Sequence, residues 1–255
     1  MTTPSSSDKN APIFHGSVAI VTGASSGLGR EYSRMLVANG ARVLLVGRSQ
    51  LRLQALADEL GDAVVPLSLD VGAVGAAQQA VDAALAAFGR LDMVLPNAGL
   101  YADGQVDEVP EDRLHEIVAA NVFGVMALVS ASLPLLRVGG GDILVTSSVS
   151  GHQTISWEPI YTATKHAVHS YVSAVRQQLA GTNIRVGAVA PGVVLNELWG
   201  FAEGGDGVEQ LVSDRVAEAG GILSTDVAEA VLFMLSRPRH VTIRDLVILP
   251  SGQAI

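Results

Sequence analysis

Short, unbroken apolar runs alternate along the chain with longer stretches in which apolar residues recur every three or four positions. Seven runs have the length of buried strands, near residues 18–21, 42–46, 64–69, 93–95, 143–146, 184–189 and 246–249. Between the strands, apolar side chains share one helix face, as at Val74, Ala77, Val81, Leu85 and Phe88. Strands without polar alternation are buried on both faces. The pattern therefore predicts an α/β fold, a single doubly wound parallel sheet of about seven strands with helices on both faces.

The longer helices are expected at residues 27–39, 111–120, 122–136 and 161–179. The chain shows neither an internal repeat nor a linker, so residues 13–255 are expected to form one domain. Residues 1–12, rich in Ser, Thr and Pro, are predicted to be a disordered tail.

Residues 194–224 break the alternation with six glycines around a short amphipathic piece. They follow a predicted strand, and ligands of open α/β sheets bind beyond the carboxyl ends of the strands. The segment is therefore expected to be a substrate lid, and a plain surface insertion is the alternative.

Composition narrows the classes of function. The 255 residues carry a net charge of −9 and include no cysteine. A chain with a net negative charge lacks the basic surface that nucleic-acid binders use. A chain without cysteine has no disulfide, thiolate catalysis or cysteine-bound metal. The most apolar stretch, residues 122–136, is shorter than the roughly 20 residues of a membrane span and is expected in the core or a subunit interface. We expect a soluble, cytoplasmic protein that binds neither nucleic acid nor membrane.

A glycine-rich segment, Thr22-Gly23-Ala24-Ser25-Ser26-Gly27-Leu28-Gly29, joins the first predicted strand to the first helix. Glycines at such a turn let the backbone approach a pyrophosphate, which the helix N-terminus then stabilises. The spacing differs from the commoner Gly-x-Gly-x-x-Gly fingerprint, and a turn without a ligand is the alternative. Asp70, at the end of the third strand, either accepts a hydrogen bond from an adenine amine or is a turn residue.

Tyr161 and Lys165 are spaced so that their side chains share one helix face. A tyrosine that acts as a base near neutral pH needs its pKa lowered by two or three units, roughly 3–4 kcal/mol. A lysine charge about 5 Å away contributes about 3 kcal/mol at an effective dielectric constant near 20. Lys9 is the only other lysine, beside fourteen arginines, which indicates that position 165 needs an ammonium. The alternative is an amphipathic helix with a surface lysine.

With Ser148 just beyond a predicted strand, the chain resembles the classical short-chain dehydrogenase/reductase family from Ser17 to Pro250. The resemblance is carried by motifs in family order and spacing, namely the glycine segment, Asn97-Ala98-Gly99, Asn121, Ser148, Tyr161-x-x-x-Lys165 and Pro191-Gly192. It implies a Rossmann-type sheet and hydride transfer with a nicotinamide cofactor, the protein supplying orientation and electrostatics.

The resemblance also implies four catalytic residues. Tyr161 would be the general acid/base, and Ser148 would hold the substrate oxygen. Lys165 would lower the pKa of the tyrosine and bind the nicotinamide ribose, and Asn121 would hold a water in a proton relay.

The cofactor contacts implied are Gly23, Ser25, Ser26, Gly27, Leu28, Gly29, Arg48, Asp70, Val71, Asn97, Ala98, Gly99, Tyr161, Lys165, Pro191, Gly192, Val194 and Asn196. Two positions depart from the family pattern: Pro96 stands in place of an Asn, and Asn196 in place of a Thr.

The second strand ends in Arg48 where an acid would hold the ribose hydroxyls of NAD. Because Arg48 could pair with a 2′-phosphate, NADP is favoured over NAD.

Three segments, 157–163, 185–189 and 241–250, look like ribitol dehydrogenases, and the last is also similar to dehydrogenases of serine-like hydroxy acids. The substrate contacts expected are Ser148, Ser150, Trp157, Tyr161 and Trp199. The predicted function is an NAD(P)-dependent oxidoreductase that interconverts a secondary alcohol, a ribitol-like polyol, and a ketone. The alternatives are a 3-hydroxy acid dehydrogenase, a small carbonyl reductase, or a non-catalytic NADP-sensing regulator.

Two further expectations concern metal and assembly. His166 and His169 share a helix face, but with no carboxylate partner beside them no metal site is expected. Relatives in the family usually form tetramers through the helices corresponding to residues 122–136 and 161–179, which implies a homotetramer.

Overall fold

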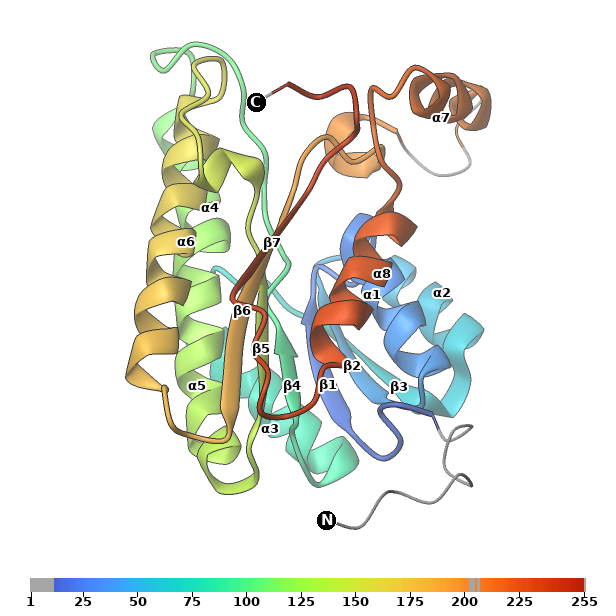
Figure 1. Cartoon of the computed structure of the whole chain (residues 1–255), viewed down its shortest axis with the longest axis vertical. Helices are drawn as coiled ribbons and strands as arrows, with labels where there is room; N and C mark the ends of the chain where they lie inside the picture. Colours follow the sequence, from blue (N-terminus) through green and yellow to red (C-terminus); the bar gives the residue numbers. More distant parts are fainter. Residues whose placement is uncertain (1–11, 202–204, 206, 255) are drawn as a thin grey trace.

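The computed structural model describes residues 12–201, 205 and 207–254, and Figure 1 shows one sheet with helices packed on both faces. All strand pairs are parallel, in the order β3-β2-β1-β4-β5-β6-β7. The strands are β1 (Val18–Thr22), β2 (Arg42–Gly47), β3 (Val64–Ser68), β4 (Met93–Leu95), β5 (Gly141–Thr146), β6 (Ile184–Pro191) and β7 (Asp245–Ile248). The helices are α1 (Gly27–Ala38), α2 (Gln50–Leu60), α3 (Ala76–Phe88), α4 (Glu111–Val118), α5 (Gly124–Gly139), α6 (Pro159–Gln178), α7 (Val208–Ala217) and α8 (Ser224–Leu235). The predicted Rossmann-type α/β fold is confirmed.

Alternate residues of the central strands face opposite sides of the sheet, because side chains alternate along a strand. Ala19 and Val21 of β1 belong to a core formed with α1, α2 and α8, whereas Val18 and Ile20 belong to a core formed with α3, α5 and α6. Figure 1 shows these two groups of helices on the two sides of the sheet. Both faces are thus covered, which explains why the strands are apolar at every position.

The helices predicted at residues 111–120 and 122–136 are one continuous helix. α4 passes into α5 through a π-helical turn, η2 (Ala119–Phe123), so that Glu111–Gly139 runs for 29 residues. The expectation that this stretch is too short to cross a membrane is wrong, since the whole helix is long and apolar enough by length and composition. The core helix of a protein outside the membrane passes the same test, and α5 buries Leu128 and Leu136 in the core beside the sheet.

The sheet has a topological switch point at its centre. β1 pairs with β2 on one side and with β4 on the other, so the connections that leave these strands diverge. Ligands of open α/β sheets bind in the crevice beyond such strand ends. The segments that follow β1, β4, β5 and β6 carry the predicted site residues to this edge.

The chain between β6 and α8 leaves the sheet and returns beside its own start. Val194 forms an isolated bridge with Ile222, and the Leu195 N–H donates to the Ile222 carbonyl at 2.9 Å. A short turn, η4 (Glu197–Trp199), and α7, which buries none of its residues, lie between these ends. The predicted lid at residues 194–224 therefore has a fixed base, and its closure over a substrate stays a prediction.

Two predictions fall partly outside the described residues. The predicted disordered tail covers residues 1–11, which the structure does not describe, and Pro12, whose carbonyl accepts a hydrogen bond from the His15 N–H at 3.1 Å. Within the predicted lid, residues 202–204 and 206 also lie outside the described part of the chain.

Candidate active site

The turn between β1 and α1 brings two glycines into contact with neighbouring backbone. Gly23 has a left-handed φ of +69°, and a Cβ there would lie 2.9 Å from Asn97 Nδ2. Gly29 lies against the Gly23 carbonyl without room for a Cβ. Ser26 precedes α1 and makes no side-chain cap in the described structure. The first N–H groups of α1 are therefore available to an anion such as a pyrophosphate.

The segment Asn97-Ala98-Gly99 is joined to the end of β1. Thr22 Oγ1 accepts hydrogen bonds from the N–H groups of Asn97 (2.9 Å) and Ala98 (3.0 Å), and Asn97 Nδ2 donates to the Thr22 carbonyl at 3.0 Å. Because β1 and β4 are neighbours in the sheet, these bonds hold the two strand ends in register at the switch point.

Ser148, Tyr161 and Lys165 come together beyond the carboxyl end of β5. Tyr161 and Lys165 lie on α6, one turn apart, and Ser148 precedes the short turn η3 (Val149–Gly151). The Tyr161 hydroxyl is hydrogen-bonded to the Ser148 side chain, and Lys165 Nζ donates to the Thr146 carbonyl at 3.0 Å. Each of the three residues is 8% exposed or less. The geometry therefore places a hydroxyl pair beside a buried ammonium.

Burial determines the pKa of both groups on α6. Burial raises the pKa of Tyr161, the Ser148 hydrogen bond lowers it, and the charge of Glu158 raises it. Burial lowers the pKa of Lys165 to about 8, so the ammonium persists at neutral pH. Lys165 Nζ lies 5.5 Å from the centre of the Tyr161 ring. The predicted lowering of the Tyr161 pKa by Lys165 is therefore not met in this structure, because desolvation of the hydroxyl dominates.

Asn121 lies in the π-helical turn η2 and is 1% exposed. Its Oδ1 accepts from the Leu100 N–H at 2.7 Å, and its Nδ2 donates to the Leu100 carbonyl at 2.9 Å and to Thr164 Oγ1 at 3.1 Å. These bonds tie the segment after β4 and α6 to the long α4–α5 helix. The predicted role of Asn121 in a proton relay stays a prediction.

Two adjoining cavities lie over the carboxyl ends of the strands. The first, of about 260 Å³, is lined by Tyr161 and Lys165 together with the glycine turn. The second, of about 350 Å³, shares Gly23 and Ala98 with the first and reaches Arg48. The two cavities form one path from the end of β2 to the buried hydroxyl pair.

Most predicted cofactor contacts line these cavities. The first holds Gly23, Ser26, Gly27, Leu28, Asn97, Ala98, Gly99, Tyr161, Lys165, Pro191, Gly192, Val194 and Asn196. The second adds Ser25, Arg48, Asp70 and Val71. Gly29 lines neither cavity. It contributes to the turn indirectly, since the absence of a side chain lets α1 lie against the Gly23 carbonyl. Asp70 Oδ1 accepts from the Gly72 N–H at 2.9 Å, so it is also a turn residue.

The predicted substrate contacts divide into two groups. Ser148, Tyr161 and Trp199 line the first cavity. Ser150 lies behind Ser148, 3% exposed, with its N–H donating to Ser148 Oγ at 3.2 Å. Trp157 is 62% exposed and lines neither cavity.

Three residues beyond the predicted cofactor and substrate contacts lie in or beside the site. Tyr101 packs its ring against Tyr161 at 5.1 Å and Trp199 at 4.9 Å between ring centroids. Glu158, 2% exposed, accepts a hydrogen bond from Ser150 Oγ and is hydrogen-bonded to Tyr101.

The third, Arg52, lines the second cavity with Arg48. The four-residue spacing of these arginines at the start of α2 is a signal that could have found Arg52. No spacing in the sequence links Tyr101 to Tyr161.

The family model for short chain dehydrogenases matches residues 17–203 of the chain. The chain belongs to the short-chain dehydrogenase family. It is accordingly an NAD(P)-dependent oxidoreductase. An uncharacterised oxidoreductase of Staphylococcus epidermidis is 30% identical over 234 residues, 91% of this chain and 96% of its own. One of Staphylococcus aureus is 31% identical over 235 residues, with the same coverage.

Solved structures of the family share the fold over nearly the whole chain. A serine dehydrogenase complexed with NADP⁺ superposes with a TM-score of 0.84 at 29% identity, covering 93% of this chain and 96% of its own. An alcohol dehydrogenase from Thermococcus sibiricus, complexed with 5-hydroxy-NADP, has a TM-score of 0.83 at 29% identity and covers 94% and 98%. A 3-ketoacyl-(acyl-carrier-protein) reductase from Brucella melitensis, complexed with NADH, has a TM-score of 0.81 at 28% identity and covers 92% and 97%.

The residues of this short-chain dehydrogenase fit a nicotinamide dinucleotide. The glycine turn and the N-terminus of α1 offer N–H groups to a pyrophosphate. Lys165 is buried at the cavity wall and its ammonium has three N–H groups, one of which goes to the Thr146 carbonyl. Arg48 and Asp70 line the far cavity, where an adenosine would lie.

Proposed function

We propose that this protein interconverts a secondary alcohol and a ketone, with Tyr161 as general acid/base and Ser148 as the residue that holds the reacting oxygen. The observation that carries the proposal is the buried Ser148–Tyr161 hydroxyl pair beside Lys165, in a cavity continuous with the glycine turn. Bound NAD(P) would accept or donate the hydride. The side chains have only to orient the oxygen and move one proton.

The direction of proton transfer follows from charge. In reduction, neutral Tyr161 donates its hydroxyl proton to the oxygen that becomes the alcohol. In oxidation, Tyr161 must first lose that proton, which burial opposes. The Lys165 ammonium stabilises the resulting tyrosinate. The role of Lys165 is therefore to make an otherwise unfavourable anion accessible.

NADP is the preferred cofactor in this proposal. Arg48 and Arg52 both line the cavity at the end of β2. A guanidinium pairs with phosphate through two parallel hydrogen bonds, whereas the ribose hydroxyls of NAD gain little from a positive charge. Asn97-Ala98-Gly99 and Asp70 would flank the adenosine, and Asn196 would contact the carboxamide end.

The substrate in this proposal is a ribitol-like polyol. Ser150 and Tyr101 are both hydrogen-bonded to the buried carboxyl group of Glu158. A polyol needs several donors and acceptors around its reacting hydroxyl, and the support for this substrate is that these polar groups lie next to Ser148 and Tyr161.

A 3-hydroxy acid dehydrogenase is the alternative, and the similarity to a serine dehydrogenase favours it. The Glu158 carboxylate weighs against it, because it would repel a substrate carboxylate. A small carbonyl reductase remains a further alternative within the enzyme class.

The oligomeric state in this proposal is a homotetramer. The α4–α5 helix exposes apolar side chains that point away from the core, Leu114, Val118 and Phe123 among them. Exposed apolar helix faces of this kind mark subunit interfaces. Light scattering coupled to gel filtration tests this, and a monomer at micromolar concentration would contradict it.

The function is tested with a panel of pentitols, hexitols, hydroxy acids and simple ketones, each offered with NAD and NADP. Turnover is followed by the absorbance of the reduced nicotinamide. Turnover of a pentitol with NADP supports the proposal. Binding of NADP without turnover of any panel member would favour the non-catalytic NADP-sensing regulator.

A further inference from the structure

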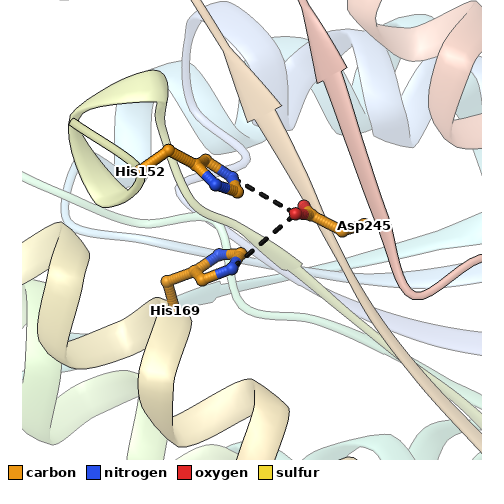
Figure 2. A group of neighbouring side chains, drawn as sticks. All are labelled: His152, His169 and Asp245. Carbon is orange, nitrogen blue, oxygen red and sulfur yellow. Dashed lines mark ion pairs between the residues drawn. The ribbon is translucent and has the colours of Figure 1, made fainter.

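Two histidines and an aspartate from three separate segments meet beside the sheet. His152 follows η3, His169 lies on α6, and Asp245 is the first residue of β7. Figure 2 shows both imidazole rings directed at the Asp245 carboxylate. The expectation of no metal site rested on the lack of a carboxylate beside His166 and His169, and that premise is wrong for His169.

The distances in this cluster are long for hydrogen bonds. Asp245 Oδ2 lies 3.3 Å from His152 Nε2 and 3.7 Å from His169 Nε2, whereas N–H···O bonds have lengths of about 2.7–3.2 Å. The three candidate ligand atoms lie within 4.8 Å of one another. Zn²⁺ binds imidazole nitrogen at about 2.0–2.1 Å in a tetrahedron, whose ligand atoms are then about 3.3 Å apart. The two separations between imidazole nitrogen and carboxylate oxygen, 3.3 and 3.7 Å, are therefore close to the edge of such a tetrahedron.

One oxygen of the Asp245 carboxylate has no hydrogen-bond partner among the described residues. Asp245 is 11% exposed at its side chain, and its buried Oδ1 makes no hydrogen bond with any residue that the structure describes. A buried carboxylate oxygen without a partner is costly. A cation held by Asp245 and the two imidazoles would neutralise the carboxylate.

The histidines are suited to binding a metal. The two rings are tilted by 57° with centroids 4.2 Å apart, so both can direct a nitrogen to one point.

We propose that His152, His169 and Asp245 bind one Zn²⁺ ion, with water at the fourth position. The ligand set of two imidazoles and one carboxylate is one that zinc accepts and that Mg²⁺ does not favour. His169 and Asp245 also line a cavity of about 390 Å³ with Arg176 and Arg244, which gives the ion and its water an entry path.

The ion has a structural role, because none of its three ligands lines the cofactor cavities. His152 lies four residues after Ser148, and His169 lies one helical turn after Lys165. Asp245 begins the strand that pairs with β6 as far as Pro191. Zinc would thus join the segments that carry Ser148 and Lys165 to β7, the strand that pairs with β6 beside the Pro191-Gly192 turn.

The test uses the full chain without a polyhistidine tag, stripped with a chelator. Equilibrium dialysis against ZnCl₂, with metal quantified by mass spectrometry, gives stoichiometry and affinity. We expect one Zn²⁺ per chain, no competition by Mg²⁺, and a higher Tm with zinc. Zinc at about 100 times its Kd raises the folding equilibrium constant about 100-fold.

Variants assign the ion to this cluster. His169→Gln and Asp245→Asn each remove one ligand, and His152→Gln removes the most exposed one with the least risk to folding. Each is expected to weaken zinc binding by more than the about 10–100-fold caused by losing an outer-shell partner. His166→Gln, on the same helix but with its ring bonded to the Thr162 carbonyl at 3.0 Å, is the matched control and should bind zinc like the wild type. The proposal is overturned if the wild type binds no stoichiometric zinc, or if the three ligand variants bind it as well as His166→Gln does.

Discussion

The Lys165 ammonium lies 5.5 Å from the centre of the Tyr161 ring and gives its hydrogen bond to the Thr146 carbonyl, not to the tyrosine. Any effect of the ammonium on the tyrosinate must therefore act through space, without a direct hydrogen bond. Burial raises the pKa of Tyr161 and lowers that of Lys165 to about 8, so as pH rises Lys165 loses its proton before Tyr161 does.

The pH dependence of the two reaction directions should differ. Alcohol oxidation needs ionised Tyr161, so its rate rises as pH increases towards the raised pKa of the hydroxyl. It stops rising when Lys165 loses its proton near its pKa of about 8. Ketone reduction needs neutral Tyr161 and should keep its rate at lower pH. Profiles of kcat/KM in both directions, for the wild type and Lys165→Met, check this. The rise of kcat/KM for alcohol oxidation should move to higher pH in the variant. An unchanged rise would show that Lys165 does not act on Tyr161.

Cofactor preference should depend on the two arginines at the end of β2. Arg48→Ala is expected to weaken NADP binding by about tenfold or more, because a charge-assisted contact of about 1.5–3 kcal/mol is lost. NAD binding should change little, and Arg52→Ala should show a smaller effect of the same sign. Isothermal titration with both cofactors measures this. If the wild type binds NAD as well as NADP, the inference from Arg48 is wrong.

Glu158 should discriminate between polyols and hydroxy acids. Glu158→Gln keeps the shape of the side chain but removes the carboxylate that accepts from Ser150. The variant is expected to lose about tenfold or more in kcat/KM for a pentitol, equivalent to about 1.4 kcal/mol of transition-state binding, while a simple secondary alcohol loses less. A 3-hydroxy acid should be used better by the variant, because repulsion is removed. Equal losses of kcat/KM for all three substrates would show that Glu158 supports the fold and does not select the substrate.

A buried ion pair outside the site joins the amino-terminal ends of β5 and β6 and should contribute strongly to stability. Asp142 accepts from Arg185 Nε at 2.6 Å and from Arg239 Nη1 at 2.9 Å. Asp142→Ala is expected to cost about 3–5 kcal/mol of unfolding free energy, because it leaves the buried charge of Arg185 without a carboxylate partner. Arg239→Ala, which removes a partner that is 44% exposed at its side chain, should cost about 1 kcal/mol or less. Urea denaturation of the two variants checks the difference, and equal losses would refute the argument from burial.

The fold could be predicted almost fully, because both faces of the sheet are covered and each strand is apolar throughout. The continuity of the helix near Ala120 could not, since the π-helical turn continues the helix with i→i+5 hydrogen bonds and its residues, Ala119–Phe123, include neither glycine nor proline to mark it. Tyr161, Lys165 and the glycine turn were found from local spacing.

Contacts between distant segments were not accessible to the sequence reasoning. Tyr101 reaches Tyr161 only through the packing of the segment after β4. His169 meets Asp245 across 76 positions of the chain, because β7 pairs beside β6 next to α6. The sign of the Tyr161 pKa shift was also missed, since a calculation from charge spacing omits the desolvation that the fold imposes.

The central claim is that Tyr161 moves the proton of an alcohol oxidoreductase. It is tested most directly by measuring NADP-dependent turnover of the best panel substrate by the wild type and Tyr161→Phe, with NADP affinity measured on the same samples. We expect the wild type to turn over and the variant to lose about 10²–10⁴-fold in kcat while it still binds NADP. Turnover by Tyr161→Phe at the wild-type rate would contradict the claim.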